Sequence, residues 1–429
     1  MTGDIRLNPN TKYQTITGWE AHIQAGQTHP QFASFKNELF QRAASELGIS
    51  RVRIEPRASV EHSRDLDDEF ERGVIDQATY RCLRFTTEND NDDPSTINWD
   101  GFHFSGLDKY IDSSVLPMQQ IMAARGEALY VVATYVAFTA QNCAGTQYHH
   151  TDPDEYAEFV LATHLHMQQK YGFVPDAWEI ILEPDNTAEW RGLQIGRAIV
   201  AAAGRLEQNG FTPRFITPSN RSMGNAVTYF DDMIQVPGAL KHVSELAYHR
   251  YGALDPAALQ GIGNRAVQHG IRTSMLERIG AGYQELHTDL EVGRVSAWQQ
   301  FALAFPTTDN GAQYYVIDSN GSIQLGSRSR FLRQYFLYVR PGAVRIDAQT
   351  TRQGLDPLAF INTGNRYVVV VKAAAQSTFT VGGLPAGTYG TTYTTAGATH
   401  VAAPDVTIAA GAELTASIPA AGVVTISRK

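Results

Sequence analysis

The fold is constrained most strongly by a regular alternation of strand-like and helix-like segments between residues 13 and 340. Each strand-like run is short and apolar, and each is followed by a helix or by a segment of helical size. The eight runs cover residues 13–18, 50–55, 128–135, 177–182, 214–218, 243–248, 272–276 and 294–298. Repeated strand–helix units form a parallel sheet, and eight of them in about 330 residues predict a closed (β/α)8 TIM barrel, an α/β fold.

The pattern changes after residue 345. Residues 373–429 contain only four charged side chains and are rich in Thr, Ala, Gly and Val. Short alternating runs separated by glycine-rich turns predict a C-terminal all-β sandwich module. The predicted domains are an N-terminal strand contributing to the sandwich at 1–12, the barrel at 13–344 with an acidic insertion at 61–100, and the sandwich at 345–429.

Composition and charge exclude several classes of protein. The chain has 35 Lys and Arg against 44 Asp and Glu, a net charge of −9, and no block of basic residues. Nucleic acid and anionic membrane surfaces are therefore not expected as partners. The longest apolar stretch, 128–140, is too short to span a bilayer. The oligomeric state is left open.

The cysteine content and the N-terminus bear on the compartment. Cys82 and Cys143 are too few for a disulfide-scaffold domain or a multi-cysteine metal site, and they are either joined in one bridge or both free. The chain begins with polar residues and shows no signal peptide. We expect a secreted or periplasmic protein whose leader has been removed, with a cytoplasmic protein as the alternative.

Two acidic residues occupy positions typical of catalysis. Glu183 follows the apolar run 177–182, and Glu277 follows the run 272–276. In a barrel of this kind the functional side chains lie at the C-terminal ends of the strands. Two carboxylates about 5–5.5 Å apart at that edge supply the nucleophile and the acid/base for double displacement at a glycosidic bond. The alternative for each is an ion pair at the end of a strand.

Other candidate groups are weaker. Glu245 lies inside a predicted strand and is interpreted as an ion-pairing residue, whereas Glu55 ends one and could touch substrate. The His149-His150 pair and Asp152 match no tight ligand spacing and lie at a predicted helix start, so we expect no metal site there.

Several motifs around the two glutamates carry a family resemblance. They are Gln-x-Ile-x-Gly-Trp-Glu at 14–20, His-x-Tyr at 249–251, Ser-Arg-Phe at 329–331 and Arg-Pro-Gly-Ala-Val-Arg-Ile at 340–346. Together with Glu183 and Glu277 they resemble the clan A retaining glycoside hydrolases. The opening and closing segments look most like glycoside hydrolase family 30, and the resemblance covers nearly the whole chain.

The resemblance implies roles for individual residues. Glu183 would be the general acid/base, protonated at the start, and Glu277 the nucleophile. Tyr251 would orient the nucleophile, Arg53 would lie beneath it and keep it ionised, and Trp298 would form a floor under the sugar ring. The remaining substrate-binding candidates are Trp19, Glu20, Tyr135, Asn186, Trp190, Asn220 and His249. No cofactor is implied, and the expected substrate is a β-linked oligo- or polysaccharide.

One position departs from the family pattern. Residues 182–184 read Leu-Glu-Pro where the family has Asn-Glu-Pro. That Asn contacts the sugar 2-hydroxyl, a contact that contributes several kcal/mol in the transition state and that Leu182 cannot make. Three explanations stay open. Asn186, Asn220 or Glu20 could make this sugar contact instead, or the substrate could be a sugar with an unusual 2-position, acted on by this or another clan A family. The third explanation is a homologue that binds glycans without cleaving them.

Overall fold

The computed structural model describes residues 3–252 and 254–429, and in this part strands alternate with helices. The strands of the first sheet are β2 (Gly18–Ala25), β3 (Arg51–Ile54), β4 (Tyr130–Thr134), β5 (Ala177–Glu179), β6 (Phe215–Asn220), β7 (Val243–His249), β8 (Arg272–Glu277), β9 (Val295–Phe305), β10 (Gln313–Ile317) and β11 (Ile323–Leu325). The helices are α1 (Phe32–Arg42), α2 (Leu66–Glu71), α3 (Gln77–Leu83), α4 (Ser105–Tyr110), α5 (Leu116–Ala124), α6 (Pro153–Tyr171), α7 (Gly192–Gln208), α8 (Met223–Met233), α9 (Pro256–His269), α10 (Tyr283–Thr288) and α11 (Ser329–Phe336). None of these helices is long and apolar enough to cross a membrane within the described residues.

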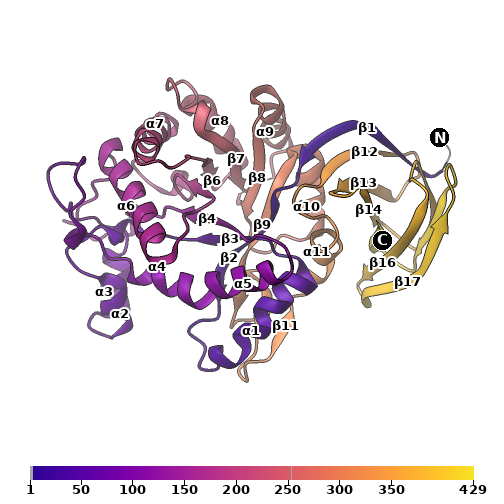
Figure 1. Cartoon of the computed structure of the whole chain (residues 1–429), viewed down its shortest axis with the longest axis horizontal. Helices are drawn as coiled ribbons and strands as arrows, with labels where there is room; N and C mark the ends of the chain where they lie inside the picture. The colour runs from indigo at the N-terminus through magenta and orange to yellow at the C-terminus, as the bar shows by residue number, and fades with distance from the viewer. Residues whose placement is uncertain (1–2, 253) are drawn as a thin grey trace. The chain divides into compact units, whose positions relative to one another are not determined.

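The strand order establishes the fold class. It runs β11-β10-β9-β2-β3-β4-β5-β6-β7-β8, with β8 paired again to β9. Strands β2 to β9 therefore close into a parallel eight-stranded barrel with helices between the strands (Figure 1). The predicted TIM barrel with a C-terminal β module is confirmed.

The first and last barrel strands differ from the prediction. The first barrel strand is β2, not residues 13–18, because residues 13–15 end the long strand β1 (Ile5–Thr15) of the second sheet. The polar residues Glu20 and His22 interrupt the apolar run that would have marked β2. The last barrel strand, β9, continues seven residues beyond Trp298. Trp19 and Glu20 therefore lie within a strand rather than after one, and Trp298 lies inside β9 rather than at its end.

The chain divides into two compact units. One comprises the described residues up to 50 together with 120–128 and 278–429, and the other comprises 51–119 and 129–277 with strands β3 to β8. In the second unit a disulfide joins Cys82 of α3 to Cys143 after β4, with the Cα atoms 5.1 Å apart. The two cysteines are thus bridged.

The longest helix of the second unit begins and ends where its sequence predicts. Asp152 caps α6 by accepting the backbone N–H of Asp154, and Pro153 occupies the first turn, where it loses no hydrogen bond. Gly172 ends the helix in the left-handed conformation at φ 74°. The first two turns bury Glu155 and Glu158.

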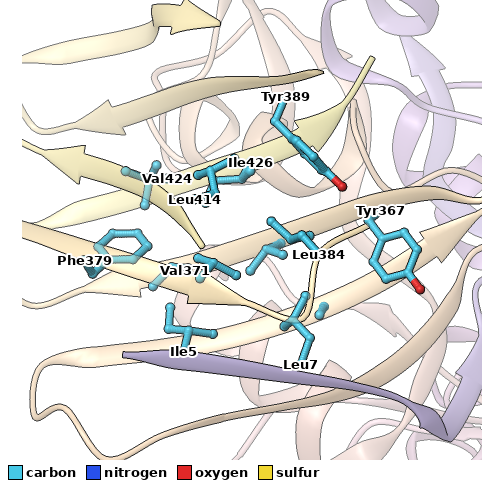
Figure 2. Close-up of a cluster of buried hydrophobic side chains, with 14 of the residues drawn as sticks. Ile5, Leu7, Tyr367, Val371, Phe379, Leu384, Tyr389, Leu414, Val424 and Ile426 are labelled. Carbon is cyan, nitrogen blue, oxygen red and sulfur yellow. The ribbon is translucent and has the colours of Figure 1, made fainter. Parts of the chain in front are cut away.

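The β module is a nine-stranded sheet built around its own core. Its strands after the barrel are β12 (Val344–Thr350), β13 (Leu355–Asn362), β14 (Arg366–Ala373), β15 (Ser377–Gly382), β16 (Gly387–Thr395), β17 (Ala398–Ile408), β18 (Leu414–Ile418) and β19 (Gly422–Arg428). The N-terminal β1 lies beside β12 and runs antiparallel to it (Figure 1), and it also pairs in parallel with β15. Ile5 and Leu7, two residues apart on one face of β1, are fully buried in the cluster with Phe379 and Val424 (Figure 2).

Candidate active site

The polar residues of the second unit gather where its parallel strands end. Strands β3 to β8 pair in parallel, so their C-terminal ends share one edge. Asn220, His249 and Glu277 are the last residues of β6, β7 and β8, and Glu183 lies four residues after β5. Active sites of (β/α)8 barrels occupy this edge.

Glu277 is held at both oxygens. Arg53 of β3 donates from Nη2 to Oε2 at 2.7 Å, and the Tyr251 hydroxyl donates to Oε1 at 2.9 Å. The Arg53 guanidinium is fully buried and also contacts Glu55 at 3.0 Å. The two donors, one on each oxygen, fix the orientation of the carboxylate.

Glu183 is held by its backbone as well as its side chain. It adopts the left-handed conformation, with φ 47° and ψ 62°, and its N–H donates to the carbonyl of Ser219, which is itself left-handed at φ 55°. Such backbone strain costs about 1–3 kcal/mol in a non-glycine residue and concentrates at functional sites. The Oε1 atom of Glu183 lies 2.8 Å from His249 Nδ1, and its Oε2 atom accepts a hydrogen bond from Asn186 Nδ2 at 2.6 Å.

The two carboxylates approach each other closely. One oxygen of Glu183, one of Glu277 and one ring nitrogen of His249 all lie within 4.8 Å of one another. This spacing meets the distance requirement for a metal ion, but the Arg53 cation already compensates Glu277 at 2.7 Å. The arrangement presents two acids with different partners, one beside a cation and one beside an imidazole.

Two buried groups complete the electrostatics. Burial lowers the pKa of His249, but its hydrogen bond to Glu183 and the charges of Glu183, Glu277 and Glu179 outweigh burial, so the pKa is raised overall. Glu179 of β5 is also fully buried, and burial raises its pKa against the charges of Arg53 and His249. The sequence prediction missed Glu179, although an acid within the apolar run 177–182 was a visible signal.

Leu182, which stands where the glycoside hydrolase family 30 pattern has Asn, lies in apolar surroundings. Leu182 is 5% exposed and packs with Phe85 and Val136. Asn220, by contrast, is fully buried, and within the described residues neither its amide oxygen nor its amide nitrogen has a hydrogen-bond partner. Buried polar groups are nearly always paired, so Asn220 is an exception that calls for a partner.

Four of the five predicted aromatic residues are fully buried, and the fifth, Tyr251, is partly exposed. In the first unit, Trp19 donates from its indole N–H to the carbonyl of Val339, and Trp298 donates to Asp289. Glu20, also buried, accepts at its backbone carbonyl from the Tyr314 hydroxyl.

In the second unit, Tyr135 and Trp190 each bond the hydroxyl of Tyr148, and Tyr135 also bonds His150. These four aromatic rings are therefore packed inside the protein, with their polar atoms bonded to protein groups.

Comparisons with known proteins bear on the fold. No protein-family profile and no curated protein sequence matches the chain. Among solved structures, the catalytic domain of GH30 xylanase C from Talaromyces cellulolyticus matches with a TM-score of 0.70 and 15% identity over 99% of both chains. A GH30 endoxylanase from Clostridium papyrosolvens C71 matches with a TM-score of 0.69 and 16% identity, over 99% of this chain and 100% of that one. An endo-β-1,6-glucanase matches with a TM-score of 0.68 and 16% identity, over 99% and 94%. This chain therefore has a fold like that of the GH30 glycoside hydrolases.

Proposed function

We propose that this protein is a retaining β-glycoside hydrolase that cleaves β-linked oligo- or polysaccharides, with Glu277 as nucleophile and Glu183 as general acid/base. The observation that carries the proposal is the pair of strand-end carboxylates, with oxygens within 4.8 Å of each other. Retaining enzymes hold the two carboxyl groups about 5–5.5 Å apart, whereas inverting enzymes need about 6.5–9.5 Å to admit a water molecule. The GH30-like fold supports the same class of reaction.

The contacts of each acid match its proposed role. Ionised Glu277, beside Arg53 and Tyr251, attacks the anomeric carbon while protonated Glu183 gives its proton to the leaving oxygen. Glu183, now a carboxylate, then takes a proton from water, and that water releases the sugar from Glu277.

We assign the sugar contact that Leu182 cannot make to Asn220. Its side chain is buried and unpartnered at the end of β6, the strand between those that lead to Glu183 and His249. An amide offers one acceptor and two donors, which suits a sugar hydroxyl. Asn186 is the less suitable replacement because its amide nitrogen already donates to Glu183.

Azide rescue tests the two roles separately. Wild type, Glu277→Ala and Glu183→Ala are assayed on aryl β-glycosides and β-linked polysaccharides, with exposed Glu71→Ala as the matched control. With azide, Glu277→Ala should form the inverted glycosyl azide and Glu183→Ala the retained one. Turnover that survives in Glu277→Ala without azide would refute the assignment. A wild type that binds β-glycans and cleaves none would indicate a glycan-binding homologue instead.

We also propose that the protein is exported. Disulfides such as Cys82–Cys143 form and persist in oxidising compartments outside the cytosol. One solved structure of similar fold, with a TM-score of 0.71 and 13% identity, is described as a conserved exported protein from Bacteroides fragilis. Fractionation of expressing cells tests this proposal, which fails if the protein stays with reduced cysteines in the cytosol.

A further inference from the structure

A second group of acidic residues in the second unit is not used by the proposed reaction. Glu155 and Glu158 lie one turn apart on the buried side of α6, so their side chains share a face. Asn89 and Asp90 belong to the acidic loop of the insertion, and Glu61 follows β3. Glu61 and Glu158 are 0% and 1% exposed.

Five oxygens of this group lack donors. Both carboxylate oxygens of Glu158, Oε2 of Glu155, Oδ1 of Asn89 and Oδ1 of Asp90 are buried, and no hydrogen bond reaches them in the part of the chain that the structure describes. All five atoms are acceptors. Buried carboxylates are rarely left without a donor or a cation, so this arrangement points to a missing positive charge.

The neighbouring groups do not supply that charge. Glu61 is already satisfied, since Oε2 contacts His150 Nε2 at 2.6 Å and Oε1 accepts the Asp90 N–H at 3.2 Å. Arg205 lowers the pKa of Glu158, but burial and the charges of Asp90, Glu61 and Glu155 raise it to about 9.

We propose that Glu158 and Asp90, with the amide oxygen of Asn89, bind one calcium ion. Calcium prefers carboxylate and amide oxygens and completes six to eight ligands with water. Asn89 Nδ2 donates to Glu155 Oε1 at 3.3 Å, which brings the loop of the insertion against α6, one turn from Glu158. The ion joins the loop of the insertion to α6. This site is independent of the proposed hydrolase activity.

Calorimetry on the full chain after EDTA treatment tests the proposal. We expect one Ca²⁺ to bind per chain and to raise Tm by a few degrees. Glu158→Gln, a near-isosteric neutral variant, should lose both the binding heat and the Tm rise. Asp154→Asn removes one exposed charge from the same helix and should keep both. Asn89→Ala should weaken binding at least tenfold, and it serves as the second variant if Glu158→Gln fails to fold.

The outcomes that would overturn the proposal are specific. They are a wild type that binds no Ca²⁺, a Glu158→Gln variant that binds it as tightly as wild type does, and binding of Mg²⁺ in preference to Ca²⁺. Since none of these measurements uses a glycoside, they are unaffected by the outcome of the azide experiments.

Discussion

Replacing Leu182 by Asn, the residue that glycoside hydrolase family 30 has at the matching position, tests whether this position tolerates a polar group. The Leu182 side chain is 5% exposed and packs against Phe85 and Val136, with Phe138 at the edge of the cluster. An Asn here would place an amide among apolar side chains. We expect Leu182→Asn to destabilise the protein and to bring no gain in turnover, because Asn220 is proposed to make the sugar contact.

The magnitude follows from two contributions. Loss of a buried leucine side chain costs about 1.5–3 kcal/mol. Burial of an unpartnered amide costs about 1–3 kcal/mol more. The expected loss of unfolding free energy is therefore about 2.5–6 kcal/mol, a large part of the roughly 5–15 kcal/mol typical of folded domains.

Urea unfolding measures this loss, provided that the m-value stays unchanged. Leu182→Met is the matched control, since a volume-conserving apolar exchange costs less than about 1.5 kcal/mol. An Asn variant whose free energy of unfolding lies within about 1 kcal/mol of the wild-type value would refute the packing argument. An Asn variant with higher turnover would show that the family contact is still available here, and would remove the role assigned to Asn220.

Two further predictions concern activity and pH. Tyr251→Phe removes a 2.9 Å hydrogen bond to Glu277. Since a hydrogen bond to a charged group contributes about 1.5–3 kcal/mol, kcat should fall about 10- to 100-fold with little change in Tm. An unchanged kcat would contradict the orienting role. Burial lowers the pKa of His164 to about 4. Its stabilising contribution should therefore be complete above pH 6.5 and should fall by about 3 kcal/mol between pH 6.5 and 4, because the unfolded chain binds the proton more tightly. The free energy of unfolding, measured across this pH range, should fall less steeply in His164→Gln than in wild type. An equal dependence on pH in both proteins would contradict the argument.

The local elements were predictable because they depend on neighbouring residues. Helix α9, for example, begins at residue 256 because Asp255 caps its start, and it ends at residue 269 because Gly270 follows in the left-handed conformation. The barrel strands at both ends of the repeat were placed less well. Their boundaries depend on pairing with distant strands, as where Thr15 at the end of β1 pairs with Val344 of the other sheet.

The sequence alone determined the repeated strand–helix units, the β module and the two acids that end apolar runs, because periodicity and strand-end position are local properties of the chain. Only the tertiary structure decided which groups meet. Arg53 contacts Glu277 across 224 residues, and His249 contacts Glu183 across 66. Barrel closure sets such contacts through the register of every intervening strand, and no short window of sequence contains that information.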